Sequence, residues 1–202
     1  KLKKVFEDVK APVDPAERIY YPVSDNQEPL IYIGTDKEVK NPSVNIFFKH
    51  EATPDSLKNT ISYYASQYML SMAMTMLNNR LNELRQTANP PFTNASAGYG
   101  EFFLAKTKEA FSLDARSKVD GIDLAMKTVL EEAERARRFG FTATEYERAR
   151  ANYMQGVESA YNEREKTKSG SYVNEYVNNF LDKEPIPGIE FEYMLTKQMA
   201  PN

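Results

Sequence analysis

The sequence contains no cysteine and a single histidine, His50. Without thiols the chain can form neither a disulfide nor a thiolate metal ligand, and its redox compartment stays undetermined. A catalytic zinc ion is usually held by three protein ligands, typically including two imidazoles. One histidine excludes a site built on paired imidazoles. We therefore expect no metal ligands and no catalytic residues in this chain. We interpret His50 as an ordinary polar residue at the end of a strand.

Strong charge and long apolar runs are lacking as well. The formal net charge is −3, from 26 basic and 29 acidic residues that are interspersed. Such a chain has no basic surface of the kind that a nucleic-acid phosphate backbone selects. No stretch reaches the roughly 20 apolar residues that a membrane-spanning helix needs. Motifs for a serine nucleophile elbow or a phosphate-binding loop are also missing. We expect no nucleic-acid partner and no membrane span.

The composition is that of one folded domain. Hydrophobic residues make up 41% and charged residues 27% of the 202 residues, which is ordinary globular usage. Three prolines without hydrophobic periodicity predict an extended connector over residues 1–25, which leaves residues 26–202 as a single domain. Because the sequence begins at Lys1, without Met or a signal-like apolar region, we expect it to be processed or excised.

Four segments have the composition or alternation of β-strands, and they come in two pairs. They are residues 30–34 and 44–49, followed after a helix by residues 97–107 and 109–117. Two such pairs predict a four-stranded, mostly antiparallel sheet with helices packed on one face. The predicted fold class is therefore α+β, with the element order ββαββαααα.

Helical periodicity and capping residues place five helices in that order. The first should begin at Thr53-Pro54 and end near Thr87, before two prolines, and its wide apolar stripe indicates contacts on more than one side. After a helix that Gly140 ends, Thr142 and Glu145 form a capping box for the next one. Two shorter helices follow, around residues 173–181 and 191–199.

Three further stretches carry a family resemblance. They are MLNNRLNELRQ at 76–86, the helix, Gly-Phe-Thr and second helix at 120–153, and residues 175–199. In order and spacing they resemble the insulinase and pitrilysin-like zinc metallopeptidases, which include the mitochondrial processing peptidases. Members build a clamshell from homologous α+β domains, one of which holds zinc through His-x-x-Glu-His and a distant Glu. Here His50-Glu51 is followed by Ala52, so the chain resembles a domain of this family without the metal site.

The resemblance also implies substrate-binding positions. In partner domains of the family, an arginine at the end of the long helix and a tyrosine seven residues later help to hold the substrate carbonyl. Arg85 matches the arginine, but the seventh residue on is Phe92, which has no hydroxyl. Tyr99 is the substitute if the intervening loop carries an insertion. An aromatic ring packed on the sheet is the simpler interpretation of Tyr99.

Two functions follow as expectations. The first is a non-catalytic domain of a bacterial zinc metalloendopeptidase, which encloses and positions a peptide substrate against a zinc-bearing sister domain in the same or a partner chain. The second is a non-enzymatic interaction or assembly module with the same fold. An unrelated enzyme that uses only carboxylates, with Glu101 and Asp114 as the pair, is a third interpretation. The resemblance suggests a periplasmic or cell-envelope location, with the cytoplasm as the alternative, and isolated copies could form a homodimer.

Overall fold

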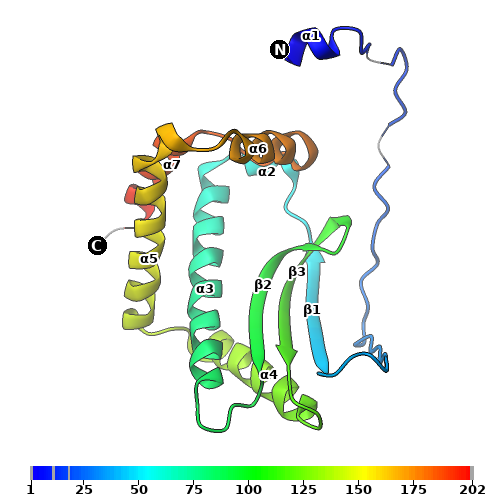
Figure 1. Ribbon diagram of the computed structural model, residues 1–202, viewed down its shortest axis with the longest axis vertical. Coiled ribbons are helices and arrows are strands. Elements are labelled where there is room, and N and C mark those ends of the chain that lie inside the picture. Colours follow the sequence, from blue (N-terminus) through cyan, green and yellow to red (C-terminus); the bar gives the residue numbers. More distant parts are fainter. Residues whose placement is uncertain (1, 11, 18, 201–202) are drawn as a thin grey trace.

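The computed structural model describes residues 2–10, 12–17 and 19–200. Its sheet has three antiparallel strands in the order β1-β3-β2 (Figure 1). The strands are β1 (Ser43–Glu51), β2 (Asn94–Phe102) and β3 (Ala105–Arg116). The register places Arg116 opposite both Ser43 and Asn94, so β3 is central and the other two strands are edges.

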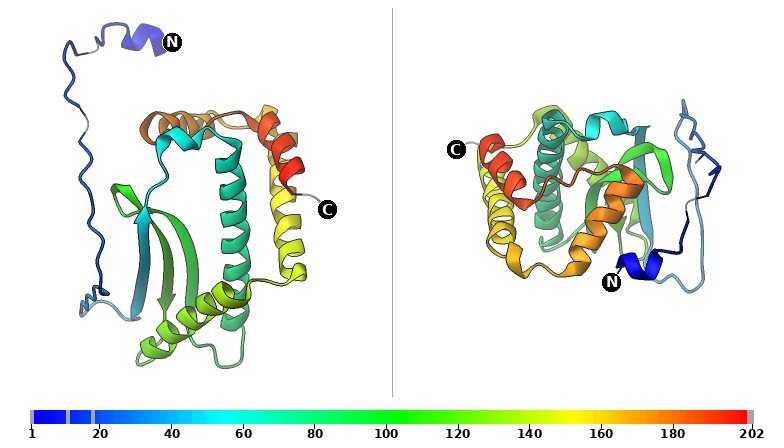
Figure 2. Two further views of the ribbon diagram at one scale, coloured as in Figure 1. Left: turned by 180° about the vertical axis from the view of Figure 1, so that it is seen from behind. Right: turned by 90° about the horizontal axis from the view of Figure 1, so that it is seen from above.

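Seven α-helices lie in the described parts of the chain. They are α1 (Leu2–Phe6), α2 (Asp55–Lys58), α3 (Ile61–Arg85), α4 (Ile122–Phe139), α5 (Ala143–Asn162), α6 (Ser169–Asp182) and α7 (Ile189–Met199). Figures 1 and 2 show α3 between the sheet and α5, with α7 against α5 and α6 crossing one end of the molecule. None of the described helices is both long and apolar enough to span a membrane.

The long helix α3 is buried on two sides. Toward the sheet and α4 it contributes to one core cluster, and toward α5 it contributes to a second cluster, as its wide apolar stripe predicted. Leu81, Leu113 and Val129 in the first cluster have no exposed surface. Burying each of these side chains contributes roughly 1.5–3 kcal/mol. The second cluster contains Tyr68 and Met72, among others.

The expected four-stranded sheet in the order ββαββαααα is wrong. The described order is αβααββαααα, and residues 30–34 form no strand. The side chains from Leu30 to Ile33 are 83–92% exposed. A β-propensity measures how well side chains fit a pleated, half-buried surface. No described strand or helix offers that surface to residues 30–34, so their β-branched and aromatic composition misled the prediction.

Two boundaries also differ from the expected ones. The helix expected to start at Thr53 is divided into α2 and α3, because the Thr60 hydroxyl accepts a hydrogen bond from the Tyr63 amide at 3.1 Å and so starts a new helix. The predicted third strand runs through a turn, since β2 and β3 are joined at Phe103, whose φ is 54°. The capping box of Thr142 and Glu145 is confirmed at the start of α5.

A buried ionic cluster around Arg80, which we call the Arg80 cluster, joins three helices. The guanidinium of Arg80 on α3 contacts Glu145 of α5 at 2.9 Å and Glu132 of α4 at 3.1 Å. It also donates to the Gly140 carbonyl at 3.1 Å and lies 4.6 Å from the centre of the Phe141 ring. These charge-assisted hydrogen bonds raise the pKa of Arg80, with Glu145 as the largest cause. The cluster therefore links α4 and α5 to α3.

Candidate functional site

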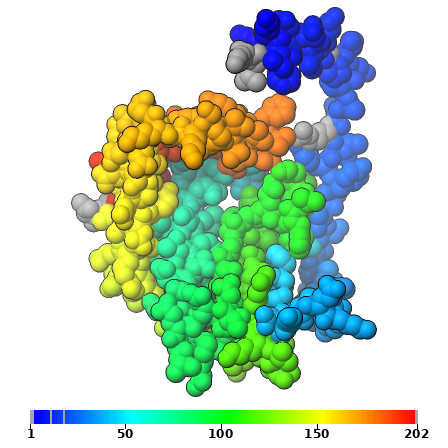
Figure 3. Space-filling view, in the orientation of Figure 1, coloured from blue at the N-terminus to red at the C-terminus, as the bar shows by residue number. Residues whose placement is uncertain are grey.

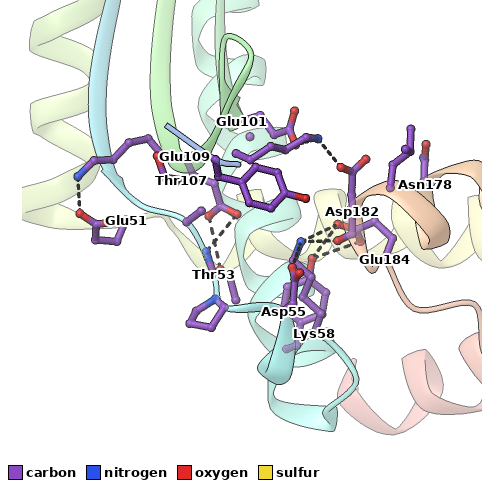
Figure 4. A pocket seen from close by; sticks show the side chains of 18 of the residues that line it. Glu51, Thr53, Asp55, Lys58, Glu101, Thr107, Glu109, Asn178, Asp182 and Glu184 are labelled. Carbon is purple, nitrogen blue, oxygen red and sulfur yellow. Dashed lines mark hydrogen bonds and ion pairs between the residues drawn. The ribbon is translucent and has the colours of Figure 1, made fainter. Parts of the chain in front are cut away.

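A polar cavity of about 610 Å³ lies where the sheet, the start of α3 and the end of α6 meet (Figure 4). One wall is the end of β1 and the connector through Thr53, and a second is the β2–β3 hairpin. α2 and the first turn of α3 form the floor, and the C-terminal end of α6 completes the rim. Segments more than 120 residues apart in the sequence thus face one another, as Lys58 and Asp182 do.

Glu109 of β3 organises the sheet side of this cavity. Its carboxylate accepts a hydrogen bond from the Tyr99 hydroxyl at 3.0 Å and from the backbone and side chain of Thr53 at 3.4 and 3.5 Å. Burial, together with this carboxylate, raises the pKa of Tyr99 to about 12. The His50 ring stacks on Tyr99 with the ring centres 5.4 Å apart. Tyr99 is therefore a neutral hydrogen-bond donor at neutral pH.

Two lysines connect the cavity walls to the end of α6. Lys106 on the hairpin pairs with Glu101 at 2.6 Å and with the carboxylate of Asp182. Lys58 donates to the backbone carbonyl of Asp182 at 2.6 Å and pairs with Asp55 at 3.2 Å. Hydrogen bonds to Asp182 and Glu101, in that order, raise the pKa of Lys106. Both ammonium groups are already paired with carboxylates.

A third lysine ties the N-terminal segment to the sheet. Lys108 is only 3% exposed, and its ammonium contacts Asp25 at 2.8 Å and the carboxylate of Glu51. Its hydrogen bond lowers the pKa of Asp25. Next to it, Lys49 donates to the Ser24 carbonyl at 2.5 Å. These contacts hold residues 24 and 25 against the strands, beside the cavity.

The cavity has a surplus of negative charge. Six carboxylates face three ammonium groups, and neither histidine nor cysteine is among the lining residues. The carboxylates are Glu51, Asp55, Glu101, Glu109, Asp182 and Glu184. Tyr63 donates to Glu184 at 3.3 Å, and its pKa is raised by burial and by that carboxylate. This arrangement can hold a polar or cationic group.

The three residues predicted to contact substrate do not come together. Arg85 is exposed at the end of α3, where its guanidinium donates to the Asn82 side chain at 2.8 Å. Phe92 is 2% exposed and belongs to the core cluster between the sheet, α3 and α4. Tyr99 alone lines the cavity, toward the other end of the sheet. Their role in substrate binding stays a prediction.

The carboxylates that were weighed as an enzymatic pair are also separated. Glu101 lies opposite Glu109, whereas Asp114 lies opposite Ser96, five residues further along β3. Burial raises the pKa of Asp114. Glu109, Lys106 and Asp182 were missed by sequence reasoning. No motif marks them, because they are brought together only by the hairpin turn and by the path of α6 across the sheet end.

Metal ligands are not grouped in the part of the chain that the structure describes. Among those residues there is no group of three or more His, Cys, Asp or Glu side chains that could hold a metal ion. The sequence also has no His-x-x-Glu-His string. The donor set present here does not fit a catalytic zinc ion.

The sequence comparison and the structure comparison both find proteases. The chain is 28% identical over 200 residues to an Arabidopsis thaliana protein named zinc protease PQQL-like. It superimposes on the first half of the periplasmic protease PqqL from Escherichia coli with a TM-score of 0.71 and 17% identity, over 81% of this chain. An insulinase family protease from Yersinia pestis gives a TM-score of 0.76 and 12% identity over 98% of the chain. No family model matches.

The chain is similar to insulinase-like zinc proteases in sequence and in fold. The sequence relative is named a zinc protease and one structural neighbour an insulinase family protease, which confirms the resemblance found in the sequence. The insulinase-like relatives are much longer than this chain. It matches 18% of the length of the Arabidopsis protein, 34% of the first half of PqqL and 42% of the Yersinia protein. In each relative, the matched region is therefore one part of a larger protease.

Proposed function

We propose that this chain is a non-catalytic domain of a zinc metalloendopeptidase, and that it encloses and positions a peptide substrate against a zinc-bearing sister domain. The main support for this proposal is that the chain has an insulinase-like fold and that His50 is its only histidine. The zinc of the parent protein would then be bound by another domain. A wall that positions the substrate and excludes water lowers the reaction barrier without contributing a reacting group.

The cavity supports this proposal through its chemistry. Its surplus of carboxylates suits the amide donors and cationic side chains of a peptide. We propose Arg85, Phe92 and Tyr99 as the positions to test for substrate contact, with Tyr99 first because it lines the cavity. We also propose that residues 1–25 act as a connector into the domain formed by residues 26–202.

The test compares the isolated chain with the complete polypeptide encoded by its reading frame. We expect zinc and chelator-sensitive cleavage of an unstructured peptide in the complete polypeptide, and neither in residues 1–202 alone. Metal content by mass spectrometry and peptide cleavage by chromatography measure both. Chelator-sensitive proteolysis by residues 1–202 would refute the proposal. A reading frame without a His-x-x-Glu-His domain, in a protein with no peptidase partner, would favour the interaction module instead.

The compartment is proposed from one relative. PqqL of Escherichia coli is described as a periplasmic protease, which suggests a periplasmic or cell-envelope location for the parent protein. Fractionation of cells that express the complete reading frame distinguishes the periplasm from the cytoplasm.

A further inference from the structure

Half of the methionines in this chain line one hollow. The chain has eight methionines among its 202 residues. A hollow of about 470 Å³ between α3, α5 and α7 is lined by eight residues, and four of these are Met69, Met72, Met76 and Met199. Figure 2 shows α3 beside α5 and α5 beside α7, and Figure 3 shows α3, in teal, between α5, in yellow, and the sheet. Thioether groups are thus far more concentrated here than in the chain as a whole.

The three α3 methionines lie on one side of their helix. Met72 follows Met69 by three residues and precedes Met76 by four, and residues at these spacings are surface neighbours with Cβ atoms about 5–6 Å apart. Met199 reaches the same hollow from the end of α7. A methionine side chain has three rotatable bonds, so thioether sulfurs that border one hollow can converge on a common point. Several sulfurs are therefore within reach of a single bound ion.

The other described lining residues leave the thioethers as the available donors. The hydroxyls of Tyr68 and Tyr146 hydrogen-bond to each other at 3.0 Å, and Ala65 and Ala73 are apolar. None of the described residues that line the hollow carries a charge. An uncharged, largely apolar site penalises a divalent ion far more than a monovalent one. Thioether sulfur is a soft ligand, and soft ligands select Cu(I) among the biological metal ions.

Core packing alone does not account for this arrangement. Met72 and Met76 are 3% and 6% exposed and fill the cluster between α3 and α5, which is a usual role of methionine. Met69, in contrast, is 61% exposed although it lines the same hollow. An exposed thioether next to two buried ones gives an ion a route from solvent to the buried sulfurs.

We infer that this hollow is a binding site for a monovalent soft metal ion, Cu(I), held by the thioether sulfurs of Met69, Met72, Met76 and Met199. The site is separate from the polar cavity, because no residue lines both, and the inference does not rest on the proposed function. It is also compatible with the poor fit to catalytic zinc. Protein sites bind Zn²⁺ through thiolate, imidazole and carboxylate groups, whereas this hollow offers thioethers.

Protection of Met69 from peroxide tests the inference on the wild-type chain. Hydrogen peroxide converts an accessible thioether into a sulfoxide, and a metal ion bound to the sulfur blocks that reaction. With an equimolar amount of Ag(I), a redox-stable substitute for Cu(I), the oxidation of Met69 measured by mass spectrometry should largely disappear. Met126 and Met194, which are 39% and 51% exposed outside the hollow, should be oxidised at the same rate in both samples. Unchanged oxidation of Met69, or equal protection of all three residues, overturns the inference.

A matched pair of double variants tests whether the methionines act as ligands. Exchange of Met for Leu conserves volume, so both variants should fold, which far-UV circular dichroism checks. Met69→Leu with Met72→Leu should weaken Cu(I) binding by more than about tenfold, since even the loss of a residue behind the ligands costs that much. Met126→Leu with Met194→Leu should leave the affinity unchanged.

Competition with a chromophoric Cu(I) chelator in the absence of oxygen measures both affinities. Equal affinities in the two variants, or a wild-type chain that takes no Cu(I) from the chelator, contradict the assignment. A hollow that takes up an apolar dye but no Cu(I) would be a groove for apolar groups only, and the inference fails. If the first variant does not fold, the peroxide experiment on the wild-type chain decides the question.

Discussion

Two ionic clusters of similar chemistry lie at different depths in this molecule. In the Arg80 cluster the three charged side chains are 9–16% exposed, whereas Lys106, Asp182 and Glu101 at the cavity rim are 23–48% exposed. The Arg80 cluster joins α3, α4 and α5 beside the core. The Lys106 contacts connect a hairpin to the end of α6, which few apolar contacts support. The comparison shows that the same pairing can hold a core together or attach one peripheral helix.

Burial decides which of these roles a pair has. Removing one partner of a desolvated pair leaves a charge without compensation, which is costly. Removing one partner of a solvated pair lets water replace it, so the net loss is small. The Arg80 cluster should therefore determine global stability. The cavity cluster should determine the local order of α6 and the shape of the candidate site.

Replacing Arg80 gives the largest expected effect. In Arg80→Ala, Glu132 keeps its buried position but loses its main partner, so the free energy of unfolding should fall by about 3 kcal/mol. Urea denaturation measures this change. Arg85→Ala, on the exposed end of the same helix, is the control and should change stability by less than about 0.5 kcal/mol. Similar losses in both variants would contradict the distinction between the two clusters.

Acid should weaken the Arg80 cluster through Glu145. Its hydrogen bond from Arg80, with smaller contributions from Thr142, lowers the pKa of Glu145 from 4.5 to about 2. A lowered folded-state pKa contributes stability that is complete above pH 4.5 and is lost as the pH falls toward 2. The stability difference between the wild type and Glu145→Gln should therefore shrink over that range, measured by denaturation at each pH. Glu147→Gln, on the exposed side of α5, shows the general effect of removing a carboxylate.

Lys106→Ala should separate local order from global stability. Because this pair is partly solvated, the free energy of unfolding should fall by at most about 1 kcal/mol. Amide hydrogen exchange in α6 should nevertheless accelerate, since the helix loses the contact between Asp182 and the hairpin. Lys127→Ala removes an exposed pair within α4 and serves as the control. Unchanged exchange in α6 would show that Lys106 does not hold the helix.

The smallest expected effect concerns a single phenol in the cavity. Tyr99→Phe removes the hydrogen bond to Glu109 and one phenol with a pKa of about 12. An alkaline titration of phenolate absorbance, as the difference between wild type and variant, should therefore show one group that ionises near pH 12. Tyr32→Phe, whose side chain is 92% exposed, gives the reference curve. A difference curve near pH 10 would mean that Glu109 and burial do not act on Tyr99.

Local signals predicted several elements well. The capping box at Thr142 and Glu145 starts α5 as expected, because a cap is satisfied by residues within one turn. Residues 109–117 were expected to form a strand, and in β3 their inward-facing Leu113 and Ala115 are buried. The strand expected at residues 30–34 failed, since a strand also needs a neighbour that its own sequence does not supply.

The candidate site shows the same limit more strongly. Tyr99 was noticed, but its partner Glu109 and the lysines around it were not. The residues that line this cavity come from a strand end, a hairpin and a distant helix. They follow no fixed spacing in the sequence, so no motif could reveal the cavity.

The sequence by itself indicated the similarity to insulinase-like zinc proteases and excluded a zinc site built on paired imidazoles, because the order of three helical segments and a count of histidines need no coordinates. Only the tertiary structure decided the strand number, the contacts of Glu109 and the approach of Met199 to the methionines of α3. Each of these depends on which surfaces meet, and packing against distant segments settles that after local propensities have been satisfied.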